Sequence, residues 1–196
     1  MAVMPLTPGL TPDAAIGGPF TVHDLETMPD DGHRYELIDG SLVVTPAPGW
    51  GHQEAAGASY RELFAACPPD LRVLIGPFAI QLAIDTELQP DVLVARYSDL
   101  TPRNLPVAPV LAIEVASPST RLIDRNLKKA AFAKFGTPSY WLIDPDIPRL
   151  TAYDLEGGDF VEVAHVMGDE VFVAERPFRV RLVPTELIRG LSPPPG

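Results

Sequence analysis

The stretch Val110-Leu-Ala-Ile-Glu-Val-Ala116 is a nearly unbroken apolar run that contains a single carboxylate. A short run of this kind is typical of a strand that is buried on both faces of a sheet. Glu114 is therefore expected inside the protein, where a carboxylate is costly unless another group compensates its charge. The same few residues thus predict a central strand and a candidate functional site.

Strands and two main helices are predicted on either side of this run. A helix is expected from Gly51 to Ala66, and another follows the Ser-Pro-Ser-Thr break at 117–120 and reaches about Phe135, with Gly136 at its end. A shorter helix is expected at 21–28. The predicted strands are 34–44 as a hairpin turning at Asp39-Gly40, 73–75, 78–84, 89–95 and 139–144, with short strands and turns over 149–183. The turn at 85–87 is expected to join 78–84 and 89–95 as a hairpin. Strands mixed with helices predict an α/β (α+β) domain in which helices pack on a central sheet.

The length of 196 residues fits one domain with flexible ends. Residues 1–19 are rich in Pro and Gly and are predicted to form a disordered arm, and residues 192–196 a disordered tail. The single domain is expected over 20–191. With 46% hydrophobic residues, this length can bury a sizeable core.

Composition excludes several classes of protein. Cys67 is the only cysteine, so neither an internal disulfide nor a thiolate metal cluster can form, which suits the cytoplasm. No signal peptide or membrane-spanning apolar run is visible. The chain also lacks a Gly-rich phosphate loop with a following Lys, a GxSxG motif and a zinc signature. The 15 basic and 26 acidic side chains give a net charge of −11, which does not attract nucleic acid.

Asp91 and Glu114 are the two acids whose positions suggest a metal site. Asp91 leads directly into the apolar run 92–95, and Glu114 interrupts 110–116. A divalent cation that prefers oxygen ligands would compensate both charges. For either acid alone, a position at a strand end beside water or an Arg is the simpler interpretation; the two together favour a site.

A basic segment follows Glu114. Residues 121–134 carry Arg121, Arg125, Lys128, Lys129 and Lys134 against Asp124 alone, a net charge of +4 that could hold phosphates. Lys128 lies beside the apolar stripe of this helix and could point toward the sheet. A solvated helix face with an i,i+4 ion pair between Asp124 and Lys128 explains the spacing at least as well.

Two further residues have open interpretations. Glu36 lies next to the Asp39-Gly40 turn, and from the residues alone it is expected to face solvent on a half-buried strand. His52 lies near the start of the first long helix. A lone His is more often structural than a ligand, so His52 is kept as a supporting residue of the site.

Five stretches in order match a known pattern: Met28–Gly40, Gln89-Pro90-Asp91, Glu114–Thr120, the run from Asp124 through Lys128 to Gly136, and Pro138–Asp144. With them the chain resembles the PD-(D/E)XK nuclease superfamily over residues 21 to about 155, and within it the Uma-type restriction endonucleases, a large group of bacterial proteins. The series as a whole is specific, although Pro-Asp alone is not.

The resemblance implies a restriction-endonuclease-like core, a central mixed β-sheet flanked by helices. It implies that Asp91 and Glu114 bind Mg²⁺, with Mn²⁺ as a possible substitute and the carbonyl of Val115 as a third ligand. Asp91, Glu114, Lys128 and Glu36 become the catalytic residues, and Arg121, Arg125 and His52 candidates for substrate contacts. In one departure, Ala116 stands where the superfamily has its Lys, and the Uma-type group carries that Lys on the following helix, here Lys128.

The implied function is a metal-dependent endonuclease, a hydrolase of phosphodiester bonds in nucleic acid, with DNA as the expected substrate. Because the chain is acidic, a partner or a homodimer could complete the nucleic-acid groove. Two alternatives stay open. One is a non-catalytic interaction module on a nuclease-like fold. The other is a metal-dependent hydrolase of another phosphate-containing substrate, for which a narrow pocket without a surrounding basic groove would be the sign.

Overall fold

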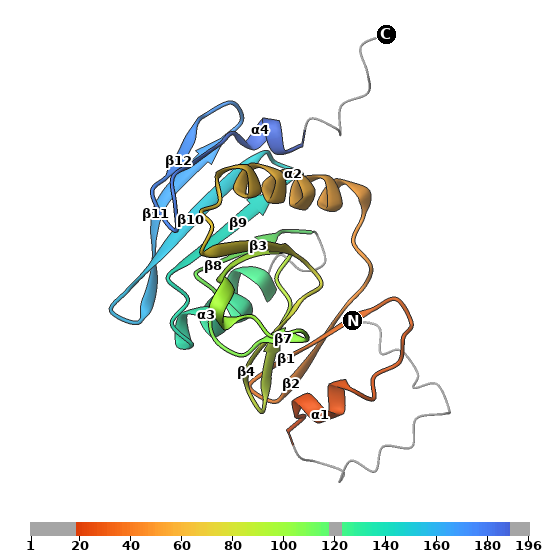
Figure 1. Cartoon of the computed structure of the whole chain (residues 1–196). Coiled ribbons are helices and arrows are strands. Elements are labelled where there is room, and N and C mark those ends of the chain that lie inside the picture. Colours follow the sequence, from red (N-terminus) through yellow and green to blue (C-terminus); the bar gives the residue numbers. More distant parts are fainter. Residues whose placement is uncertain (1–18, 118–122, 189–196) are drawn as a thin grey trace.

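The computed structural model describes residues 19–117 and 123–188, with no description of the side chains of 123–125, and it contains three sheets (Figure 1). The largest has the order β11-β10-β9-β8-β6-β3, and a second has the order β2-β1-β5-β4-β7. The strands of the large sheet are β3 (Leu71–Ile75), β6 (Val92–Arg96), β8 (Leu111–Val115), β9 (Ser139–Asp144), β10 (Arg149–Glu156) and β11 (Asp159–Met167). Those of the second are β1 (Arg34–Ile38), β2 (Ser41–Thr45), β4 (Ala79–Ala83), β5 (Thr86–Leu88) and β7 (Asn104–Leu105), and β12 (Phe172–Ala174) pairs with β13 (Val180–Leu182).

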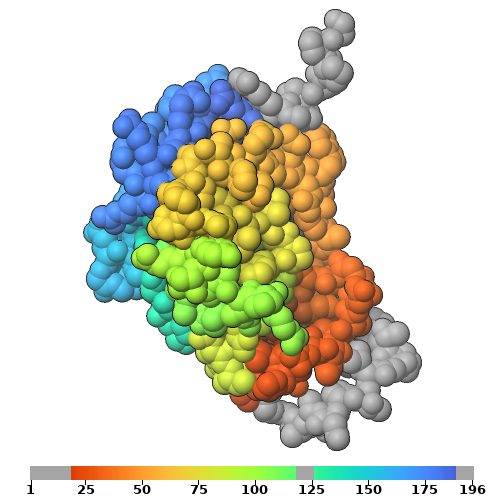
Figure 2. All heavy atoms as spheres, in the orientation of Figure 1, coloured from red at the N-terminus to blue at the C-terminus, as the bar shows by residue number. Residues whose placement is uncertain are grey.

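Helices cover the sheets rather than interrupting them. They are α1 (Val22–Leu25), α2 (Trp50–Ala66), the 3₁₀ turn η1 (Tyr97–Asp99), the π-helix η2 (Ile123–Lys128), α3 (Lys129–Lys134) and α4 (Pro184–Leu187). In Figure 2, the red residues that follow position 20 lie at the bottom of the view and the blue residues of the C-terminal part at the upper left, with yellow and green residues between them. No helix in these two ranges is both long and apolar enough to cross a lipid bilayer.

The central strand β8 divides the core into two layers. It is parallel to β9 and antiparallel to β6, so the sheet is mixed as expected. Successive side chains of a strand point to opposite faces. Leu111 and Ile113 pack in one cluster with residues of α2, whereas Ala112 packs in the other with Phe132 of α3 and residues of the second sheet. By the same alternation, Glu114 faces the second layer, between the large sheet and α3.

Several predicted elements are confirmed. The β1–β2 hairpin turns at Asp39 and Gly40, both with positive φ, and α2 and β9 lie where the sequence placed them. The short helix expected at 21–28 is present as α1, where Thr21 and Asp24 form a capping box, although it ends at Leu25. The predicted arm and tail, and the start of the second long helix, lie outside the described residues.

The predicted hairpin between 78–84 and 89–95 is wrong. The strand that pairs with β4 is the short β5, and the chain then leaves the second sheet so that β6 pairs with β3 and β8 of the large sheet. Pro90 lies between β5 and β6 and has no N–H to donate to a neighbouring strand, so the ladder of β5 does not continue into β6. The crossing at Gln89-Pro90-Asp91 therefore carries Asp91 from one sheet to the other.

Two further predictions, on the length of the C-terminal strands and on the form of the second long helix, differ from the structure. Instead of only short strands over 149–183, β10 and β11 have 8 and 9 residues, and a bulge between Ala152 and Tyr153 keeps them paired. The bulge disrupts the alternation of apolar residues by which a long strand is recognised. The second long helix begins its described part as a π-helix, which becomes α-helical only after Lys128.

Candidate active site

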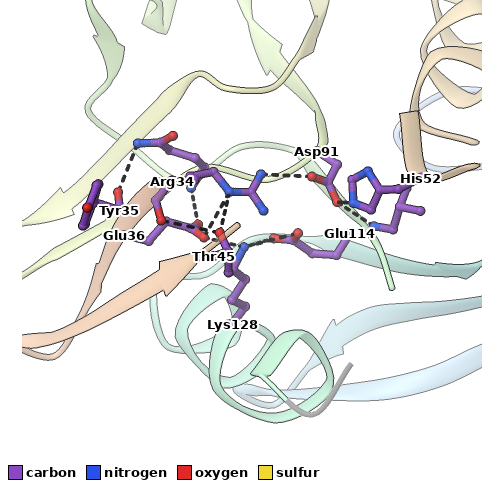
Figure 3. Close-up of polar contacts among 10 residues, drawn as sticks. Arg34, Tyr35, Glu36, Thr45, His52, Asp91, Glu114 and Lys128 are labelled. Atoms are coloured by element: carbon purple, nitrogen blue, oxygen red, sulfur yellow. Dashed lines mark hydrogen bonds and ion pairs between the residues drawn. The ribbon is translucent and has the colours of Figure 1, made fainter. Parts of the chain in front are cut away.

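The four residues expected to be catalytic lie together between the two sheets and η2 (Figure 3). Glu36 comes from β1, Glu114 from β8 and Lys128 from the end of η2, and each is completely buried. Asp91, immediately before β6, is 5% exposed. The solvent-facing position expected for Glu36 is therefore wrong, because the second sheet packs this face of β1 against the large sheet.

Lys128 joins two of the carboxylates. Its Nζ lies 2.9 Å from Oε2 of Glu36 and 3.2 Å from Oε1 of Glu114. A solvated helix face is thus excluded for this residue. The π-helical segment ends at Lys128, and such wide turns occur frequently at functional sites because they re-aim side chains. Here the side chain points from the helix into the layer between the sheets.

Asp91 is held by three donors. Its Oδ1 accepts a hydrogen bond from Nη1 of Arg34 at 3.0 Å, and its Oδ2 accepts one from the backbone N–H of Val115 at 2.8 Å. Nε2 of His52 lies 3.0 Å from the same Oδ2. Burial alone would raise the pKa of Asp91, but the contact with His52 and the charges of Arg34 and Lys128 hold it well below the ordinary value. Asp91 is therefore an ionised carboxylate.

Strand register explains why the two proposed metal ligands are neighbours. In the antiparallel pair β6–β8, Val92 lies opposite Ile113, so Asp91 and Glu114 occupy the next position of the same register. The backbone N–H of Asp91 donates to the carbonyl of Ile113 at 3.1 Å and keeps this pairing in place. Side chains directly opposite each other in such a pair point to the same face.

Arg34 is a site residue that the sequence reasoning did not single out. Besides its bond to Asp91, its Nε lies 3.5 Å from Oε2 of Glu36. Burial would lower the pKa of Arg34, but Glu36, Asp91 and Glu114 outweigh that effect and raise it. The signal was present in the strand pattern, since Arg34 and Glu36 are two residues apart on β1 and so share a face.

The residues expected to contact substrate are only partly in view. Arg121 lies outside the described residues, as does the side chain of Arg125. His52 contacts Asp91, and its Nδ1 is buried without a hydrogen-bond partner among the described residues. Two other basic residues of the segment 121–134 contact neighbouring side chains. Nζ of Lys129 lies 3.4 Å from the centroid of the Tyr153 ring, and Nζ of Lys134 lies 2.6 Å from Oδ1 of Asp39.

A cavity of about 470 Å³ opens beside Asp91. Its polar wall includes Arg34, His52 and Asp91, and further polar side chains come from His33, Thr45, Gln53 and Ser117. Much of the remaining wall comes from the segments 46–49 and 75–77, which contribute proline, alanine and isoleucine side chains and the backbone of two glycines. The candidate site is thus reached from a confined and largely apolar cavity.

The residues fit a divalent cation in donor chemistry and in charge. Three carboxyl groups, those of Glu36, Asp91 and Glu114, face the two basic side chains of Arg34 and Lys128. Across residues 19–117 and 123–188, no group of three His, Cys, Asp or Glu side chains is arranged to hold a metal ion. Two carboxylates suffice for Mg²⁺, which usually retains several waters and binds through one or two acids.

Comparison with known proteins agrees with this architecture. The chain is similar to a crystal structure from Anabaena variabilis ATCC 29413, described as "a putative nuclease belonging to DUF820", with a TM-score of 0.70 and 20% sequence identity over 89% of this chain and 100% of that one. At this identity the likeness shows the fold. No curated protein matches the chain. Residues 22–185 match the Uma2 family, whose description is "Putative restriction endonuclease". Because this match covers most of its length, the chain belongs to the Uma2 family.

Proposed function

We propose that the protein is a metal-dependent nuclease that hydrolyses phosphodiester bonds, with Asp91, Glu114, Lys128 and Glu36 as its catalytic residues. The observation that carries the proposal is the completely buried Lys128 between Glu36 and Glu114. A buried ion set of this kind stabilises a fold poorly compared with apolar packing, which favours a functional reason for it. Membership of a family described as restriction endonucleases supports the same conclusion.

Asp91 and Glu114 would hold the metal, Mg²⁺ or Mn²⁺, with the carbonyl of Val115 as a further ligand. A divalent ion at such a site acidifies water and polarises a phosphoryl oxygen. The ammonium of Lys128 would orient the attacking water by donating a hydrogen bond, and Glu36 holds that ammonium in place at 2.9 Å. Arg34 lies on the cavity wall, where its guanidinium would bind a phosphate oxygen. In this proposal Lys128 takes the role of the superfamily's lysine, whose position in this chain is occupied by Ala116.

The remaining expectations belong to this proposal. DNA as the nucleic acid, a homodimer, a cytoplasmic location and a single domain over 20–191 stay predictions. The non-catalytic alternative is less well supported, because the acidic residues and Lys128 are all present and directed toward one another. The confined cavity beside Asp91 is the sign expected for the other alternative, so a hydrolase of another phosphate-containing substrate stays a second candidate.

Calorimetric titration with Mg²⁺ and Mn²⁺ tests the proposal, on wild type, Asp91→Asn and the exposed control Asp159→Asn on β11. Plasmid and single-stranded DNA cleavage is then measured on the same samples, with circular dichroism as a check of folding. We expect wild type and Asp159→Asn to bind metal and to cleave, and Asp91→Asn to do neither. Absence of binding at millimolar metal would refute the proposal, and binding without cleavage would place the substrate outside nucleic acid.

A further inference from the structure

The described surroundings of the site lack the broad cationic face that holds a duplex. Phosphate contacts by Lys and Arg supply most of the nonspecific affinity for double-stranded DNA. Lys128 is enclosed by carboxylates, Lys129 lies against the ring of Tyr153, and Lys134 pairs with Asp39. Arg34 is directed at Asp91 and Glu36. The net charge of −11 adds no attraction at longer range.

The cavity beside Asp91 has instead the size of a pocket for a small ligand. Its volume of about 470 Å³ lies within the usual range for pockets that enclose a small ligand. Pro46, Pro48 and Pro77 line it, together with Ile75, which is 42% exposed. Such walls suit the apolar face of a base rather than the outside of a charged double helix.

Trp50 is adjacent in the chain to residues that line this cavity, although it does not itself line it. It is the first residue of α2 and directly follows Gly49, which lines the cavity. Gln53, another lining residue, is three positions further along and so shares a helix face with Trp50. The Trp50 side chain is 67% exposed, although tryptophan is highly buried on average. The other tryptophan of the chain, Trp141, is buried in the core.

We infer that the site takes an unpaired nucleotide from a single polynucleotide strand, and that Trp50 stacks on a base at the mouth of the cavity. Stacking on aromatic side chains gives single-strand affinity with little dependence on sequence. A strand bound in this way would bring its phosphodiester past Arg34 to Asp91. The inference rests on the proposed function, since it names the substrate class of the same site.

Fluorescence anisotropy tests the inference without depending on catalysis. The probes are a labelled single strand of about 15 nucleotides, its duplex and a dinucleotide, all in EDTA so that no cleavage occurs. We expect the single strand to bind at least about tenfold more tightly than the duplex, and Trp50→Ala to weaken single-strand binding by about tenfold or more. Trp50→Phe should keep most of the affinity, because phenylalanine also stacks. Phe64→Ala, which removes a 62% exposed aromatic from the far part of the same helix, should change nothing.

Tryptophan fluorescence gives a second readout. A base stacked on Trp50 should quench the emission of wild type, and Trp50→Phe should lose the quenching while it still binds. Three results would each overturn the inference. The duplex could bind as tightly as the single strand or more tightly, Trp50→Ala could leave single-strand binding unchanged, or the dinucleotide could bind as tightly as the longer strand. Binding is measured without metal, so the outcome does not depend on catalysis. A protein that selects single strands but does not cleave would refute the proposed function alone. A protein that cleaves but selects duplexes would refute this inference alone.

Discussion

At the scale of single residues, Lys128 is the group that balances the buried charges of the site. Its ammonium contacts Glu36 and Glu114, neither of which is exposed to water. Oε1 of Glu36 also accepts the backbone N–H of Gln89 at 2.7 Å. Removing the ammonium would leave two carboxylates in a place where water cannot solvate them, so the residue that serves catalysis in our proposal also serves folding.

Lys128→Met should therefore destabilise the protein by about 3–5 kcal/mol, the usual effect of breaking a buried ion pair from one side. Urea unfolding followed by circular dichroism measures the change. Lys134→Met, which removes an exposed partner of Asp39, is the matched control and should leave the unfolding midpoint in place. Adding Glu36→Gln to Lys128→Met should recover part of the stability; no recovery would show that lost packing, and not unpaired charge, causes the effect.

Asp91 predicts a dependence of stability on pH. Burial opposes the charge of Asp91, but His52 and Arg34 outweigh it and depress the pKa below the ordinary value of 3.8. A depressed pKa contributes stability that is complete above the unfolded value and is lost as pH falls toward the folded one. In EDTA, Asp91→Asn should thus be less stable than wild type at about pH 5, and the difference should shrink below about pH 4. Urea unfolding across this range measures it, and a difference that does not change with pH would contradict the assignment.

The sequence contained part of this site and not the rest. Asp91 and Glu114 could be predicted because each stands in or beside an apolar strand, and Lys128 because the family resemblance singled out its position. The burial of Glu36 could not be predicted, since a half-buried strand has two faces and only the packing of one sheet on another decides which is covered. Arg34 was accessible in principle through its spacing from Glu36.

At the scale of elements, the crossing between β5 and β6 determines where Asp91 lies. The backbone N–H of Gly76, just after β3, donates to the carbonyl of Asp91 at 2.8 Å. A Cβ at Gly76 would lie 2.6 Å from the carbonyl oxygen of Pro90 and 3.4 Å from Cα of Asp91. The close approach of the two backbones therefore requires glycine at this position.

Gly76→Ala should displace the Pro90-Asp91 backbone, weaken metal binding and lower the stability by about 1–3 kcal/mol. Gly57→Ala is the matched control, because its Cβ meets nothing within 4 Å and it lies inside α2. There alanine should stabilise the protein by about 0.5–1 kcal/mol. Thermal unfolding and calorimetric metal titration on both variants decide the matter, and unchanged metal affinity in Gly76→Ala would show that the crossing tolerates movement.

Element boundaries were predictable where local signals were strong, as at the Asp39-Gly40 turn and along the largely apolar run 111–115. The pairing of β5 with β4 could not be predicted. Two strand-like segments separated by a short turn resemble a hairpin in the sequence, whichever sheet the second segment joins. The π-helical turns before Lys128 leave no mark in a pattern of apolar residues. These features depend on contacts between distant segments.

At the scale of the whole molecule, charge is the property that limits how nucleic acid can bind. A net charge of −11 surrounds a site whose described cations are already paired. Binding should therefore depend on a few local contacts and on stacking rather than on a general attraction between opposite charges.

The salt dependence of single-strand binding should accordingly be shallow. Each phosphate neutralised in a single strand contributes about −0.7 to the slope of log K against log salt concentration. We expect a slope no steeper than about −2, equivalent to two or three phosphates. Anisotropy titrations from low to high NaCl measure it, and a slope steeper than about −4 would reveal an extended basic surface and contradict this view.

The ion set of Glu36, Glu114 and Lys128 also has a consequence for the way the protein is made. A ribosome releases Glu36 and Glu114 before it releases Lys128, the cation that both acids contact. Until then, the layer between the two sheets would have to close over unbalanced carboxylates, which is unfavourable. The nascent chain can form the β1–β2 hairpin early, but it can seal the active site only once η2 has emerged. We therefore expect the proposed catalytic residues to stay open to water until the last of them has been synthesised.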